Sequence, residues 1–171
     1  MSIVLLGARG SGKSTIGRKL ADRLWQSFID VDEQIVRRAG KTIRDIFEQE
    51  GEERFRQLET DVIREAVLLS EHVIALGGGS LMREENRKVL KDAGHKLFYL
   101  RCDAAELARR IKADPVSATT RPSLTKFGGG IHEIEHLLLE REPVYRQCMH
   151  GELDVTHLTP EDAVVFLVKM M

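Results

Sequence analysis

The sequence has little cysteine and no long apolar run, and each lack excludes a class of protein. Its two cysteines, Cys102 and Cys148, are too few for a disulfide framework and have no Cys or His neighbours at metal-ligand spacing. We therefore expect two reduced thiols. No window approaches the ~20 apolar residues of a membrane span. The apolar start at residues 1–6 is too short for a signal peptide and lacks a basic n-region. These lacks predict a soluble, cytoplasmic protein.

An excess of charge of one sign is also missing. The chain has 26 Lys and Arg against 27 Asp and Glu, a formal net charge of −1. This balance gives no electrostatic case for nucleic acid or an anionic membrane as the main partner. Any phosphate binding must come from local placement of Arg and Lys. The near-zero charge, with no obvious exposed apolar stripe, favours a monomer. The 171 residues have the size of one domain, 1–171.

Short apolar runs alternate with longer amphipathic stretches, which is the pattern of an α/β fold with a parallel sheet. Strands are expected at 3–6, 27–29, 73–76, 97–100 and 153–155. Helical periodicity marks 13–24, 52–69, 84–91, 104–111, 131–141 and 161–169. Two stretches do not fit this rhythm. Residues 32–50 are expected to hold small helical pieces, and residues 114–130, rich in Thr, Ser and Gly, are expected to form a mobile loop. Two such excursions suggest an acceptor site and a lid.

The segment Gly7-Ala8-Arg9-Gly10-Ser11-Gly12-Lys13-Ser14 fits the P-loop pattern G-x-x-x-x-G-K-[ST] and lies between an apolar strand and an amphipathic helix. Its glycines let backbone N–H groups turn inward around phosphate oxygens, and the helix adds its positive end. A chance glycine turn is the alternative, and the strand–loop–helix context argues against it. The motif does not separate a kinase from a GTPase or a motor ATPase. The expected phosphate-binding residues are Gly7, Gly10, Ser11, Gly12, Lys13, Ser14 and Thr15.

Asp30 and Asp32 follow the second expected strand. In an extended segment, residues i and i+2 face the same side. That side would be the carboxyl end of the sheet, where open α/β folds bind ligands. One acid could then serve Mg²⁺ while the other takes a proton from an acceptor hydroxyl. A pair of solvated or helix-capping acids is the alternative.

Four further segments are weak signals when taken singly. Residues 51–59 read GExxFRxxE, residues 77–79 are three glycines, Arg121-Pro122 lies in the expected loop, and residues 141–146 read RxPxYR. Together with the P-loop, the two aspartates and the run 38–47, they resemble the shikimate kinases over nearly the whole chain. The combination of DxD, FRxxE, GGG and RxPxYR is much more specific than the glycine loop, which many NTPases share.

The resemblance implies a three-layer P-loop NTPase fold of the nucleoside-monophosphate-kinase type with a five-stranded parallel sheet. It also implies transfer of the γ-phosphate of ATP to shikimate, giving shikimate 3-phosphate for aromatic amino-acid biosynthesis. The acceptor region would be about 31–60 and the lid about 115–126. By the same resemblance, shikimate would be held by Asp32, Arg56, Gly77, Gly78, Gly79 and Arg141.

The resemblance further implies a role for each charged group. Asp32 would orient or deprotonate the attacking hydroxyl. Ser14 would bind Mg²⁺ directly and Asp30 through water, while Lys13 and Arg121 would stabilise charge on the transferring phosphoryl group. Nucleotide contacts would also come from Arg109 or Arg110, either of which could stack on adenine.

The chain departs from the family pattern in two places, and other functions stay open. Residues 110–121 are longer than in compact members, and the adenine loop at 156–160 lacks the Arg or Asn often present there. The nearest rival is a kinase for gluconate or a nucleoside monophosphate. A regulatory nucleotide-binding protein is a second rival, and a GTPase is disfavoured because no N/T-K-x-D run occurs. The histidines without a paired motif are expected at the surface: His72, His95, His132, His136 and His150.

Overall fold

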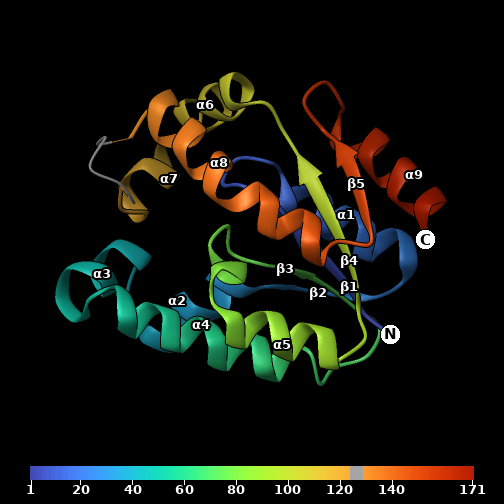
Figure 1. Ribbon diagram of the computed structural model, residues 1–171, viewed down its shortest axis with the longest axis horizontal. Helices are drawn as coiled ribbons and strands as arrows, with labels where there is room; N and C mark the ends of the chain where they lie inside the picture. The colour runs from blue at the N-terminus through green and yellow to red at the C-terminus, as the bar shows by residue number, and fades with distance from the viewer. Residues whose placement is uncertain (124–128) are drawn as a thin grey trace.

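A five-stranded parallel sheet forms the centre of the molecule in the computed structural model, which describes residues 1–123 and 129–171 (Figure 1). The strand order is β2-β3-β1-β4-β5. β1 lies in the middle, with Leu5 paired to Ala75 on one side and to Phe98 on the other. This confirms the expected five-stranded parallel sheet. The strands are β1 (Ile3–Leu6), β2 (Ser27–Asp30), β3 (His72–Ala75), β4 (Lys96–Arg101) and β5 (Gly151–Asp154).

Helices cover both faces of the sheet, which is why the three inner strands, β1, β3 and β4, are largely apolar and buried. Val4 and Leu6 pack against α2, α4, α5 and α8, whereas Ile3 and Leu5 pack against α1, α6 and α9. Figure 1 shows α4 beside α5, and α3 facing α7 at one end of the molecule. The helices are α1 (Lys13–Leu24), α2 (Val31–Ala39), α3 (Ile43–Glu50), α4 (Glu52–Ala66), η1 (Ser80–Met82), α5 (Glu84–Asp92), α6 (Ala104–Lys112), α7 (Pro115–Thr120), α8 (Ile131–Cys148) and α9 (Pro160–Met170).

Two helix ends differ from the prediction by more than one residue. α4 ends at Ala66 and not at residue 69, because the apolar residues that follow find little core and Leu68 is 83% exposed. α8 does not end at Arg141 but continues through Pro143 to Cys148. Arg141 and Tyr145 lie one turn apart on α8, and both are buried. Packing of this face against the core therefore outweighs the hydrogen bond that the proline cannot make.

Two further predictions are corrected in part. The expected loop at 114–130 begins with the helix α7, whose first residue, Pro115, has the fixed φ of a first helical turn. The part of that loop at 124–128 lies outside the described residues. His95 is buried rather than at the surface, and its two ring nitrogens face the amide of Ser2 and the carbonyl of Val67. No helix in the described ranges has the length and apolar character needed to span a bilayer.

Candidate active site

The glycine loop between β1 and α1 forms a backbone cradle. Gly10 and Gly12 have φ values of +87° and +92°, a left-handed conformation that glycine adopts without steric cost. The Lys13 ammonium lies in the cradle and donates to two carbonyls of the loop, at 2.8 and 2.9 Å. The Ser11 hydroxyl is buried there, with no hydrogen-bond partner within the described ranges. An unused hydroxyl, a lysine and a helix N-terminus together suit phosphate oxygens.

Two carboxylates lie beside the cradle, but not in the extended segment that the sequence predicted. Asp30 ends β2 and caps α2, because its Oδ1 accepts from the amide of Glu33 at 3.2 Å. Its Oδ2 accepts a hydrogen bond from the Ser14 hydroxyl. Asp32 lies in the first turn of α2. The prediction of an extended pair is wrong, since the cap starts the helix directly after the strand, yet both carboxylates line one cavity with Lys13.

Burial dominates the electrostatics of these groups. It lowers the pKa of Lys13 to about 8, although Asp32 acts in the opposite direction. Burial also raises the pKa of Asp30 above its ordinary value, a shift that the hydrogen bond from Ser14 opposes and Asp32 reinforces. A bound anion would favour the ammonium form of the lysine, and a bound cation would favour the ionised aspartate.

The larger cavity at this site has a volume of about 750 Å³ and extends from the glycine loop to the segment after β5. The guanidinium of Arg110 donates to the carbonyl of Val155 at 2.9 Å and to Glu106 at 2.7 Å. Arg109 also binds Glu106, at 2.7 and 2.8 Å. The residues predicted for the nucleotide that line this cavity are Gly10, Gly12, Lys13, Ser14, Thr15, Arg109, Arg110 and Arg121.

A smaller cavity, of about 60 Å³, adjoins the larger one and is lined by side chains from distant segments. Arg56 of α4 lies on its wall, held by Glu59 at 2.9 Å. Glu59 is fully buried and also accepts from the Ser80 hydroxyl at 2.6 Å. Burial raises the pKa of Glu59, and the charge of Arg56 opposes that shift. The carboxylate therefore fixes the guanidinium toward the cavity.

Close approach of charged side chains explains the three glycines after β3. A Cβ at Gly77 would lie 2.7 Å from Oε1 of Glu59. A Cβ at Gly79 would lie 2.7 Å from Nη2 of Arg56, and one at Gly78 would lie 3.2 Å from Nη1 of Arg141. Arg141 is 8% exposed, and its Nε has no hydrogen-bond partner in the described part of the chain. Burial raises the pKa of Tyr145 to about 12, so its hydroxyl stays protonated and donates to the carbonyl of Gly78. These contacts leave a polar wall suited to an anion.

Arg121 joins the two cavities. Its Nη1 lies 2.6 Å from Oδ2 of Asp32, and both residues line both cavities. The Arg121 carbonyl accepts from Arg44 of α3 at 3.3 Å. The described part of the expected lid therefore contacts the acceptor region directly. Residues 124–126 of the expected lid lie outside the described residues.

One residue at this site was missed by the sequence reasoning. Arg9 occupies a variable position of the glycine-loop motif, and its side chain lines both cavities. Burial lowers the pKa of Arg9 from its ordinary value, and the neighbouring Arg121 lowers it further. Only the residue type, an arginine, indicated a role for Arg9, because the motif allows any residue at that position.

The fold and the two cavities define a class: a P-loop kinase with a pocket for a small acceptor beside its phosphate cradle. The chain belongs to the shikimate kinase family, whose model matches residues 9–171. It is 42% identical over 166 residues to a shikimate kinase of Thermobifida fusca (strain YX), covering 97% of this chain and 92% of that protein.

Solved structures agree with this assignment. A shikimate kinase from Acinetobacter baumannii in complex with shikimate superposes with a TM-score of 0.90 at 32% identity, covering 99% of this chain and 91% of that chain. A gluconokinase from Sinorhizobium meliloti has a TM-score of 0.66 at 22% identity, with coverage of 99% and 90%. At that identity the likeness concerns the fold alone. Family membership therefore disfavours gluconate as the acceptor.

Proposed function

We propose that this chain transfers the γ-phosphate of ATP to a hydroxyl of shikimate, giving ADP and shikimate 3-phosphate. Beside family membership, one observation carries the proposal. Asp32 and Arg121 stand in the wall shared by a large cavity with a phosphate cradle and a small cavity lined by arginines. A phosphoryl group must pass between a nucleotide and an acceptor held side by side.

On the nucleotide side, the glycine loop and Lys13 would bind the β- and γ-phosphates. Ser14 and Asp30 offer the hydroxyl and carboxylate oxygens that Mg²⁺ prefers, and they already meet each other in the structure. When bound between these residues and the nucleotide, Mg²⁺ would neutralise negative charge on the phosphates. Lys13 would keep its ammonium form beside the phosphates, since their negative charge offsets its burial.

On the acceptor side, Arg56 and Arg141 would bind the shikimate carboxylate, because the planar guanidinium matches a carboxylate with two parallel hydrogen bonds. The backbone of residues 77–79 would contact the hydroxyl groups. Asp32 would orient the attacking hydroxyl and accept its proton. Arg121 would exchange its contact with Asp32 for the transferring phosphoryl group, stabilising charge there.

Several expectations from the sequence belong to this proposal as predictions. They are a single kinase domain over 1–171, an acceptor region at about 31–60, a lid at about 115–126, a cytoplasmic location and a monomeric state. The contact between Arg121 and Asp32 supports the lid, because it brings the segment after α7 to the acceptor cavity.

Competition among acceptors tests the function. ADP formation should be measured with ATP and Mg²⁺ against shikimate, quinate, gluconate, AMP and CMP in parallel. Turnover with shikimate should dominate. If gluconate or a nucleotide were the best acceptor, the assignment of shikimate would be wrong, while the P-loop assignment would stand.

A further inference from the structure

The segment after β5 forms one wall of the nucleotide cavity. Val155, Leu158 and Pro160 line this cavity together with the arginines of α6. Residues 156–160 offer no Arg or Asn side chain to a base. The backbone of this segment, here called the base loop (residues 155–160), offers polar contacts to a nucleotide base. Backbone groups can do this only if the loop keeps one conformation.

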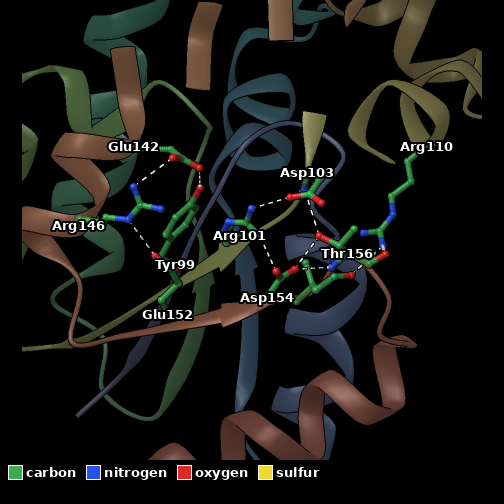
Figure 2. Close-up of polar contacts among 10 residues, drawn as sticks. Tyr99, Arg101, Asp103, Arg110, Glu142, Arg146, Glu152, Asp154 and Thr156 are labelled. Atoms are coloured by element: carbon green, nitrogen blue, oxygen red, sulfur yellow. Dashed lines mark hydrogen bonds and ion pairs between the residues drawn. The ribbon is translucent and has the colours of Figure 1, made fainter. Parts of the chain in front are cut away.

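Thr156 ties the base loop to the ends of two strands. It is 7% exposed. Its hydroxyl donates to Oδ1 of Asp154 at 2.6 Å and accepts from the amide of Asp103 at 3.1 Å, while its own amide donates to the same Asp154 oxygen at 3.0 Å. Arg101 completes the network by pairing with both aspartates. Figure 2 shows these four residues meeting where β4 and β5 end.

Arg110 ties the loop from the other side. The guanidinium binds the carbonyl of Val155 at 2.9 Å and that of Thr156 at 3.4 Å. Glu106 anchors the same guanidinium from one turn earlier on α6, at 2.7 Å. An arginine that the sequence assigned to the nucleotide is thus bound to the backbone of the loop (Figure 2).

We propose that Thr156, acting through Asp154, is a positioning residue that holds the base loop in the conformation that binds the nucleotide base. The inference rests on the proposed function only in taking an adenine nucleotide as the phosphoryl donor. Removing the hydroxyl leaves the partly buried Asp103 amide without its acceptor and the Asp154 carboxylate with one donor fewer. The loop then loses its tie while the glycine cradle keeps its own contacts.

The structure supplies a matched control on the same strand. Glu152 lies on β5 two residues before Asp154, and its carboxylate pairs with Arg146 of α8 at 3.1 Å. Arg146 also pairs with Glu142, which accepts from the Tyr99 hydroxyl (Figure 2). This second network ties β5 to α8 and leaves the base loop untouched. Asp154→Ala and Glu152→Ala therefore each remove one carboxylate from the same strand.

The test compares a ligand that has a base with one that has none. Binding of ADP and of inorganic tripolyphosphate, each with Mg²⁺, is measured by calorimetry for wild type, Thr156→Val, Thr156→Ser, Asp154→Ala and Glu152→Ala. Thr156→Val should weaken ADP binding roughly 5- to 100-fold, the effect of losing a hydrogen bond to a carboxylate and leaving the Asp103 amide unpaired, while tripolyphosphate binding stays close to wild type. Thr156→Ser should restore most of the ADP affinity. Asp154→Ala should resemble Thr156→Val, because it removes the oxygen that accepts from both the hydroxyl and the amide of Thr156, and Glu152→Ala should resemble wild type.

Several results would overturn the proposal. These are an unchanged ADP affinity in Thr156→Val, an equal loss for tripolyphosphate, or equal losses in Asp154→Ala and Glu152→Ala. If Thr156→Val does not fold, the comparison of Asp154→Ala with Glu152→Ala tests the proposal instead. The binding measurement involves no acceptor. A failure of shikimate turnover would therefore refute the proposed function, while the ADP and tripolyphosphate affinities would still test the role of Thr156.

Discussion

The nucleotide half and the acceptor half of the site are built in opposite ways. The phosphate cradle of the nucleotide half is one continuous segment, residues 7–15, whose backbone closes around its own lysine. The acceptor half takes Arg56 from α4, Gly79 from the end of β3 and Arg141 from α8. A continuous loop is specified by one short motif. An assembly of distant side chains exists only after the sheet and helices have formed.

The two halves also hold their cations differently. Lys13 faces neutral carbonyls, and burial lowers its pKa to about 8. Arg56 faces the carboxylate of Glu59, which is itself held by Ser80. A buried lysine can lose its proton, whereas an arginine stays charged. The nucleotide half should therefore respond to bound charge and to pH, while the acceptor half is preorganised.

Lys13→Ala should have the largest effect, and it falls on the nucleotide half. The change removes a cation from the transferring phosphoryl group without removing core volume. Loss of one such group lowers kcat by roughly 10²–10⁴. Steady-state ADP formation measures the loss, and circular dichroism checks that the fold is kept. A variant with more than about a tenth of the wild-type kcat would contradict the role.

Asp32→Asn and Asp30→Asn should separate the two halves at their border. Asp32 faces the acceptor, so its amide variant should lose about 10²–10³ in kcat with little change in ATP affinity. Asp30 binds Ser14 in the nucleotide half, so its variant should instead need more Mg²⁺ for half-maximal rate. Titrations of Mg²⁺ and ATP on both variants make the comparison. The reverse pattern would show that the two roles are exchanged.

Arg141→Lys should act on the acceptor half alone. Lysine keeps the charge and loses the planar fork, and a hydrogen bond to a charged group is worth about 1.5–3 kcal/mol, so the shikimate KM should rise roughly 10- to 150-fold. The ATP KM should change little. Arg146→Lys is the matched control, since Arg146 lies on the same helix and pairs with Glu142 and Glu152 outside both cavities. Equal losses for ATP and shikimate would make Arg141 structural.

The elements that the sequence predicted well depend on local patterns. The strands β1, β3 and β4 are largely buried and so appear as apolar runs, and the P-loop is contained in one short motif. The end of α8 was missed because burial of Arg141 and Tyr145 continues the helix past Pro143, and that burial comes from the rest of the fold. The sequence favoured an extended segment for Asp32. Helix capping by Asp30, which starts α2 at Val31, was only the alternative interpretation.

The candidate site divides in the same way, into a part that a local motif specifies and a part that depends on the whole fold. Residues 7–15 could be assigned to phosphate from sequence alone. Arg9 could not be assigned, since its position in the motif is variable and only the folded chain turns it toward the cavities. The surface prediction for His95 failed for a related reason. Nothing in its neighbourhood predicts that Ser2 and Val67 would surround it in the fold.

The smallest expected effect is a proton taken up by Lys13 when nucleotide binds. Its pKa, about 8 in the empty cradle against an ordinary 10.5, is lowered, so the folded protein binds fewer protons than the unfolded chain between these values. The free energy of unfolding should therefore rise as pH increases through this window. Bound phosphates reverse the shift and restore the ammonium form.

At pH 8.5, above the lowered pKa of Lys13, part of the Lys13 population should be deprotonated without nucleotide, and binding of ADP with Mg²⁺ should take up a fraction of a proton per site. Calorimetry in buffers with different ionisation enthalpies measures this proton uptake. It is the slope of the observed binding enthalpy plotted against the ionisation enthalpy of the buffer. Lys13→Arg should abolish the slope, because arginine keeps its charge in both states. Shikimate binding should give a much smaller slope, because the cations of the acceptor half are arginines. A slope for shikimate as large as that for ADP would remove the difference between the two halves, since it would mean that the acceptor also controls the charge of Lys13.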